Sequence, residues 1–173
     1  EDGYGTKRAN IMYNDFVILG PSTLQATTQE QALLEIKENH NFYSRGDNSG
    51  THSKEVSLWQ SIELDPSTCG DFYNETGKGM GDTITMASLS EYYTLSDRGT
   101  YLSMKENIEL VIAYENYQEL INQYGVIKIN PENYNKTDEY ADLFYAWIIS
   151  SEAQDLIEAY RIYDEQLFFP NAE

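Results

Sequence analysis

Several residue types are scarce in this chain, and each scarcity argues against a class of protein. Cys69 is the only cysteine among 173 residues, so an internal disulfide or a zinc site built on several thiolates is impossible. Lys and Arg number 11 against 29 Asp and Glu, and the formal charge of −18 would repel nucleic-acid phosphates and anionic lipid. No apolar run approaches the roughly 18 residues of a membrane-spanning helix. We therefore expect no nucleic-acid partner and no membrane insertion.

The motifs of common enzyme and metal-site classes are also lacking. His40 and His52 are the only histidines and lie too far apart to indicate a transition-metal site. No Gly-x-Ser-x-Gly elbow occurs, and the glycine-rich segment 77–81 lacks the Gly-Lys-Ser/Thr of a phosphate-binding loop. The segment 47–49 lacks the downstream Gly and Glu of a calcium loop. We expect no metal, no cofactor and no enzymatic turnover, although a hydrolase using Ser49 is kept as an alternative.

The remaining composition predicts a folded α/β chain. Hydrophobic residues make up 40% and aromatic residues 13%, whereas disordered acidic chains are poor in aromatics. Segments rich in β-branched and aromatic residues alternate with segments of helical periodicity, which predicts crossover connections. Strands are expected over 10–19, 41–44, 72–73, 92–96, 107–114 and 124–130. Helices are expected over 27–39, from about 51 to 62, from about 82 to 89, and twice near the C-terminus, around Phe144 and Ile157.

Two further features concern the organisation of the chain. The segment 13–21 is echoed by 122–131, and two such strands could cross at a hinge between lobes or lie in one sheet; the pattern leaves both open. Glu1-Asp2 does not look like a natural start, so we expect a processed chain or a fragment.

Asn74 and Asn135 each begin an N-glycosylation acceptor pattern, which matters only in a eukaryotic secretory setting.

Glycines and small hydroxyls gather at three predicted strand-to-helix junctions, over 44–51, 77–83 and 94–100. A helix N-terminus presents unpaired N–H groups and a partial positive charge, and ligands of open α/β sheets bind outside the carboxyl ends of the strands. Arg45 adds a forked donor that suits oxyanions, and Arg98 is a candidate for the same role at the third junction. The pattern indicates an oxyanion pocket. Three ordinary capped helix starts would give the same pattern, and the residues alone favour that simpler interpretation.

The segment Ser44-Arg45-Gly46-Asp47-Asn48-Ser49-Gly50-Thr51-His52, followed by Lys54-Glu55 and Leu58-Trp59, resembles the long signature of tungstate-binding proteins of ABC transporters. Supporting segments follow the same order at 12–21, 77–83, 93–102, 122–131 and 166–172. The resemblance covers nearly the whole chain and implies a type II periplasmic-binding-protein-like α/β fold. It implies a remnant of lobe 1 with the first hinge strand over 1–15, lobe 2 over 16–125, and the return hinge strand with helices that pack on lobe 1 over 126–173.

The resemblance also implies a function. A periplasmic or extracellular binding protein would capture tungstate, or molybdate, without covalent chemistry and deliver it to an ABC transporter permease. Arg45 would be the charged donor, with Thr94 and Arg98 near a third wall of the site. The two helix-start cradles would consist of Ser44, Ser49, Gly50 and Thr51, and of Gly79, Met80, Gly81 and Thr83.

Two departures from the family qualify this expectation. The family carries a Thr/Ser-rich anion-binding segment in its first lobe, and nothing here corresponds to it. We therefore expect the first lobe to be lacking or supplied by a partner chain, which would leave the C-terminal helices with exposed apolar surface. The charge of −18 requires an anion site to rely on local donors. A sensory or interaction domain of the same fold, binding another small anion or none, is the alternative.

Overall fold

The computed structural model describes residues 3–68, 70–134 and 139–172. Cys69 and the acceptor pattern that begins at Asn135 lie outside the described residues. The chain divides into two compact units, which we name the α/β unit, Asp15–Ile121, and the terminal unit, Glu1–Asn14 with Asn122–Glu173. Within the described residues, every helix is too short or too polar to cross a lipid bilayer.

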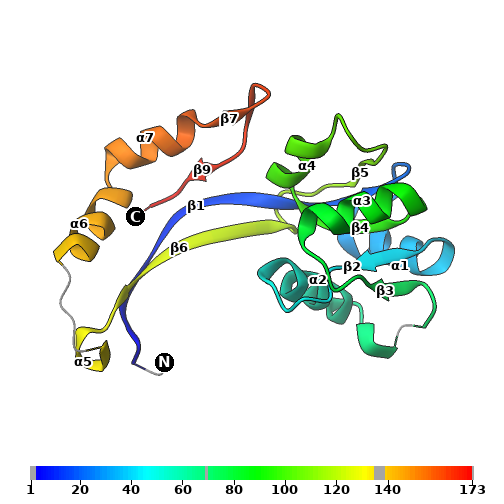
Figure 1. The fold of residues 1–173 in the computed structure, drawn as a ribbon, viewed down its shortest axis with the longest axis horizontal. Helices are drawn as coiled ribbons and strands as arrows, with labels where there is room; N and C mark the ends of the chain where they lie inside the picture. The colour runs from blue at the N-terminus through cyan, green and yellow to red at the C-terminus, as the bar shows by residue number, and fades with distance from the viewer. Residues whose placement is uncertain (1–2, 69, 135–138, 173) are drawn as a thin grey trace. The chain divides into compact units, whose positions relative to one another are not determined.

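A twisted mixed sheet forms the centre of the α/β unit (Figure 1). Its strands are β1 (Gly5–Gly20), β2 (Phe42–Ser44), β3 (Tyr73–Glu75), β4 (Tyr93–Asp97) and β5 (Val111–Tyr114), in the order β3-β2-β4-β1-β5. β2 runs parallel to both β3 and β4, whereas β1 is antiparallel to β4 and β5. The carboxyl ends of the three parallel strands therefore meet at one edge of the sheet.

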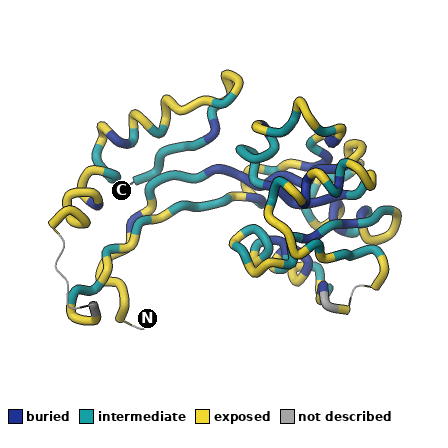
Figure 2. Tube along the Cα trace, viewed as in Figure 1, coloured by how far each residue is buried: buried dark blue, intermediate teal, exposed yellow. Residues whose placement is uncertain are grey.

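Helices cover both faces of this sheet. They are α1 (Gln29–Asn39), α2 (Gly50–Ser61), α3 (Met80–Ser90) and α4 (Arg98–Met104), with a 3₁₀ turn η1 (Pro66–Thr68) after α2. Side chains alternate along β1, so Phe16 and Ile18 enter the core that α1 and α2 cover, and Val17 and Leu19 enter the core that α3 and α4 cover. Figure 2 shows this stretch of β1 as buried. The mixed architecture confirms the predicted α/β class.

The terminal unit is built on the other half of β1. β6 (Ile121–Ile129) and β9 (Phe169–Pro170) both pair with β1 there. Three helices and a small hairpin complete the unit: α5 (Pro131–Tyr134), α6 (Glu139–Ile148), α7 (Ser151–Ala159), β7 (Arg161–Ile162) and β8 (Glu165–Gln166). The side-chain amides of Gln123 and Asn171 bond reciprocally, at 2.9 and 3.3 Å, and fasten β9 to β6.

The structure answers several expectations about the elements. The two similar segments lie in one sheet, as β1 and β6, and the hinge between lobes stays a prediction. The strand expected over 107–114 is shorter and begins at Val111. A helix does begin at the junction predicted over 94–100, as α4, because the Asp97 carboxylate accepts from the Thr100 backbone N–H at 2.9 Å and caps the helix.

Candidate oxyanion site

The carboxyl ends of β2 and β3 bring two of the predicted helix starts to the same edge of the sheet. Ser44 and Glu75, the last residues of these parallel strands, are paired in register. The loops 45–49 and 76–79 follow, and each leads directly into a helix, α2 or α3. The N-termini of both helices therefore open at one edge, which is the position where open α/β sheets bind ligands.

Thr76 ties the two loops together. Its backbone N–H donates to the carbonyl of Ser44 at 2.9 Å, and its hydroxyl donates to the same carbonyl at 3.1 Å. The Thr83 hydroxyl lies 2.9 Å from the Thr76 hydroxyl, so the chain of hydrogen bonds continues into α3. Sequence reasoning missed this residue, which was noted only as the third residue of the Asn74 acceptor pattern. The sequence signal that could have identified Thr76 is a hydroxyl residue directly after the last residue of a predicted strand.

The N-terminus of α2 has first-turn N–H groups beside open space at Gly50. The Ser49 hydroxyl accepts from the His52 backbone N–H at 3.3 Å, which satisfies one donor of the first turn of α2. The N–H groups of Gly50 and Thr51 have no partner inside a helix because they precede the first repeat of i→i−4 bonds. A Cβ built on Gly50 would meet nothing within 4 Å. The start of α2 can therefore admit a small ligand.

The second helix start has no side-chain cap at all. Gly79 occupies the cap position of α3, makes no capping hydrogen bond, and borders open space at its Cα. The amides of Met80 and Gly81 belong to the first turn, where helix geometry leaves N–H groups unsatisfied. Thr83 is fully buried, and its hydroxyl bonds the Thr76 hydroxyl, so it stabilises the loop 76–79.

Arg45 lies in the loop that leads from β2 into α2. Its side chain is 17% exposed, and its Nη2 donates to Asp47 Oδ2 at 2.5 Å. Its Nε is buried and has no hydrogen-bond partner among the described residues. The Ser49 side chain and backbone N–H, followed by Arg45, hold the pKa of Asp47 at about 2 against the opposing effect of burial. Arg45 thus retains an unused donor although one of its nitrogens is paired.

The geometry of the Arg45 loop depends on Gly46. This residue has a φ of +60°, and a Cβ there would lie 2.7 Å from Cβ of Glu75. The Gly46 backbone N–H donates to the hydroxyl of the buried Ser44 at 3.2 Å. Ser44 therefore shapes the turn that presents Arg45, a role that differs from direct contact with a ligand.

The structure does not bring the two remaining predicted residues into this arrangement. The Arg98 guanidinium donates to both carboxylate oxygens of Asp15, at 2.8 and 2.6 Å, and to Glu115 at 2.5 Å. These hydrogen bonds raise the pKa of Arg98. Thr94 is buried within β4, opposite Leu19 and next to Tyr43. The oxyanion roles of Arg98 and Thr94 stay predictions, and the site described here does not depend on them.

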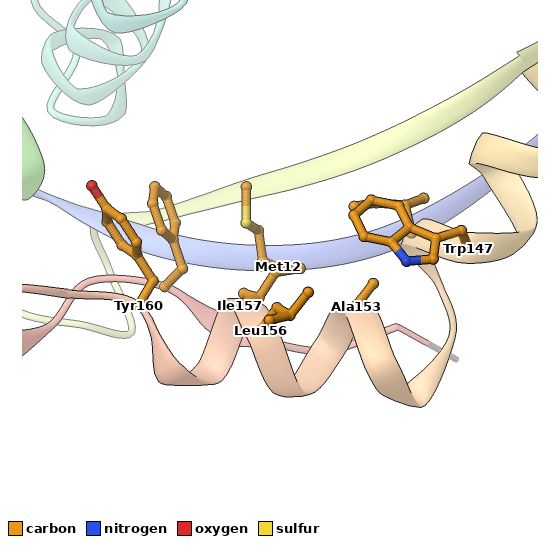
Figure 3. Close-up of a pocket in the computed structure, with 8 residues that line it drawn as sticks. Met12, Trp147, Ala153, Leu156, Ile157 and Tyr160 are labelled. Atoms are coloured by element: carbon orange, nitrogen blue, oxygen red, sulfur yellow. The ribbon is translucent and has the colours of Figure 1, made fainter.

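No competing ligand chemistry stands out elsewhere in the described part of the chain. No three His, Cys, Asp or Glu side chains gather there as a metal site. A groove of about 270 Å³ on the terminal unit is lined by apolar residues (Figure 3), and such a surface does not suit an anion. Its lining residues are Met12, Trp147, Ile148, Ala153, Leu156, Ile157, Tyr160 and Phe168.

Comparison with known proteins identifies the family. Residues 1–152 match the family model described as the PBP superfamily domain, so the chain belongs to the PBP superfamily. Among curated proteins, it is 44% identical over 181 aligned residues to the tungstate-binding protein TupA of Peptoclostridium acidaminophilum, covering 98% of this chain and 63% of that protein. It is 41% identical to a putative ABC transporter anion-binding protein of Haloferax volcanii, covering 99% of this chain and 53% of that protein.

Solved structures agree with this assignment. The tungstate-binding protein TupA of Desulfovibrio alaskensis G20 superimposes with a TM-score of 0.85 at 42% identity, covering 99% of this chain and 72% of that chain. A tungstate ABC transporter protein of Geobacter sulfurreducens gives a TM-score of 0.77 at 40% identity, covering 92% and 70%. These findings confirm the periplasmic-binding-protein-like α/β fold and the resemblance to tungstate-binding proteins. The chain spans less than two thirds of the length of the two curated relatives named above.

Proposed function

We propose that this protein captures a tetrahedral oxyanion, tungstate or molybdate, outside the cytoplasm for uptake by an ABC transporter permease, without enzymatic turnover. One observation carries the proposal: Arg45, whose buried Nε has no partner among the described residues, follows β2 at the edge of the sheet where Thr76 joins the loops that lead into α2 and α3. Guanidinium groups and helix-start amides are the donors that proteins use for oxyanions. The names of the relatives support the same ligand class.

The ligand contacts that we propose are the Arg45 side chain, the Ser49 hydroxyl and the first-turn amides of both helices. The amide donors are those of Gly50 and Thr51 in α2 and of Met80 and Gly81 in α3. Ser44 and Thr83 then act as supports, since both are buried and bonded within the protein. An overall charge of −18 does not prevent this, because distant charges are screened over roughly 8–10 Å at ordinary salt, whereas these donors act in direct contact.

Removal of the Arg45 side chain tests the proposal. Calorimetry of the full-length protein with tungstate, molybdate and sulfate is expected to show tungstate or molybdate binding that Arg45→Ala weakens by about 1.5–3 kcal/mol, roughly 10- to 150-fold. Arg8→Ala is the matched control, because Arg8 is an exposed residue that bonds Asn10 in the terminal unit. Equal affinity in both variants would remove Arg45 from the site. Absence of any oxyanion binding would favour a sensory or interaction domain instead.

We further propose that the α/β unit is one lobe of the binding protein and that the terminal unit packs on a second lobe. The described helices α6 and α7 expose Leu143 (61%), Phe144 (53%) and Leu156 (59%), which is unusual for a finished protein surface. The relatives contain chain that has no counterpart here. A lobe of that kind, in the same polypeptide or in a partner chain, would cover this face and complete the oxyanion site.

Surface labelling tests this second proposal. Cysteine placed at position 143 or 156 is expected to react slowly with a thiol reagent in the full-length protein. Cysteine at Ile129, an exposed apolar position on β6 outside these helices, is the comparison. Fast reaction at all three positions in the full-length protein would contradict a covered α6–α7 face.

A further inference from the structure

Glu55 is a buried carboxyl group that the oxyanion site does not use directly. It lies on α2 with only 3% of its surface exposed, and no Lys, Arg or His forms an ion pair with it within the described residues. Its hydrogen-bond partner is a hydroxyl group, since Tyr73 Oη donates to Glu55 Oε1 at 2.6 Å. Burial without a cation disfavours the ionised form.

The groups around Glu55 act on its ionisation in both directions. Burial raises the pKa of Glu55 to about 7, the hydrogen bond from Tyr73 opposes this rise, and the charge of Glu75 adds a smaller effect in the same direction as burial. Burial and the neighbouring Glu55 raise the pKa of Tyr73, so Tyr73 remains a proton donor. His52, one turn before Glu55 on α2, accepts from the Asn48 N–H through Nδ1 at 3.0 Å. Its Nε2 lies 3.9 Å from Glu75 Oε1.

Glu55 also lies on α2, the helix whose start forms part of the proposed anion cradle. It follows Gly50 by five residues, a distance of about 7.5 Å along the axis of α2. A dianion at the start of α2 would therefore repel an ionised Glu55 through a mostly dry interior.

We propose that Glu55 couples oxyanion capture to proton uptake, so that a proton from solvent binds its carboxylate as the dianion enters the cradle. No covalent bond changes: the anion arrives with its charge, and one proton is added to the buried oxygen. The inference rests on the proposed function of the site. Since the bound anion raises the pKa of Glu55, the complex holds more protons than the free protein, and affinity rises as pH falls through about 7. A rise of one pKa unit corresponds to about tenfold in affinity.

Calorimetry of the full-length protein with molybdate tests this. Between about pH 6 and about pH 8, we expect wild-type affinity to fall about five- to tenfold, and titrations in two buffers of different ionisation enthalpy to show proton uptake near neutrality. Glu55→Gln, which keeps the shape but cannot ionise, should bind with constant affinity and no uptake. Glu38→Gln, at an exposed position of α1, should behave as the wild type. Molybdate binding that is independent of pH overturns the inference and leaves the proposed function standing. No binding at any pH overturns both.

A measurement without ligand provides an independent check. A carboxyl group whose pKa rises from 4.5 to about 7 on folding stabilises the protein below pH 4.5, and this stability is lost as pH rises to about 7. Wild-type protein should therefore lose thermal stability relative to Glu55→Gln over this window. Parallel profiles of the two proteins would show that Glu55 ionises freely and would overturn the inference.

Discussion

The two units of this chain differ in how they bury apolar surface, and the two tryptophans show the difference. Trp59, in the α/β unit, is fully buried among Phe42, Phe72 and Tyr73, whereas Trp147, in the terminal unit, is 42% exposed. Figure 2 shows much of α6 and α7 as exposed. The donors proposed for the oxyanion all lie on the closely packed unit, where they can be held in position. The terminal unit instead leaves large apolar side chains of α6 and α7 exposed.

The largest expected effect comes from truncating these two side chains in turn. Trp59→Ala should lower the free energy of unfolding by about 3–5 kcal/mol, because it opens a cavity in a closed core. Trp147→Ala should cost only about 1 kcal/mol, since its side chain borders an open groove. Urea unfolding followed by circular dichroism measures both values. A similar loss in both variants would break the comparison and indicate that the terminal unit is covered as completely as the α/β unit.

Ion pairs in the two units should differ next most strongly. Asp15 is 2% exposed and accepts hydrogen bonds from Arg98. Arg98→Met would leave this buried carboxylate without its cation, which should lower the free energy of unfolding by about 3 kcal/mol. Lys128 and Asp142, 2.7 Å apart in the terminal unit, are 39% and 58% exposed. Lys128→Met should therefore cost less than about 1 kcal/mol. High salt should weaken only the second pair, and equal costs in thermal unfolding would contradict the larger contribution expected from the buried Arg98–Asp15 pair.

Glycine substitutions should have smaller effects that separate the units in the same way. Gly46→Ala places a Cβ 2.7 Å from Cβ of Glu75 at a φ of +60°, which should cost about 1–2 kcal/mol. Gly5→Ala in the terminal unit places a Cβ 2.6 Å from Cγ2 of Ile127 and 3.6 Å from the Lys128 carbonyl oxygen, and only the first contact is too close. Ile127 is 59% exposed and can change rotamer, so the melting temperature should fall little. A larger loss for Gly5→Ala than for Gly46→Ala would be evidence against tighter packing in the α/β unit.

The smallest expected effect is the acid sensitivity of the Arg45 loop. Bonds from Ser49 and Arg45 hold the pKa of Asp47 at about 2, below its ordinary 3.8. Because the folded-state pKa is depressed, the stabilisation is present above pH 3.8 and is lost as pH falls to about 2. Asp47→Asn should abolish this acid-induced loss of stability. The loss should be less than about 1 kcal/mol, because the site is partly exposed. Asp142→Asn, on the terminal unit, controls for the change in net charge. An unchanged acid melting profile in Asp47→Asn would contradict the prediction.

Much of the α/β unit was predictable because its signals are local. The strand–loop–helix order around Arg45 and around Gly79 follows from residues within one or two turns of each other. The junction over 94–100 was recognised in the same way, and Asp97 and Thr100 form the cap of α4 there. The ion pair that engages Arg98 was not predictable, since Asp15 is 83 positions away in sequence. The link from Thr76 to Ser44 likewise spans 32 positions and depends on the pairing of β2 with β3.

The sequence by itself determined where the helix starts and the forked donor lie along the chain, because backbone propensity, capping and hydrophobic alternation act between neighbouring residues. The tertiary structure alone decided which charges remain available. Arg98 is occupied by Asp15 and Glu115, while Arg45 keeps a free donor and Glu55 is buried without a cation. The physical reason is that burial and ion pairing depend on groups that only the packed sheet brings together.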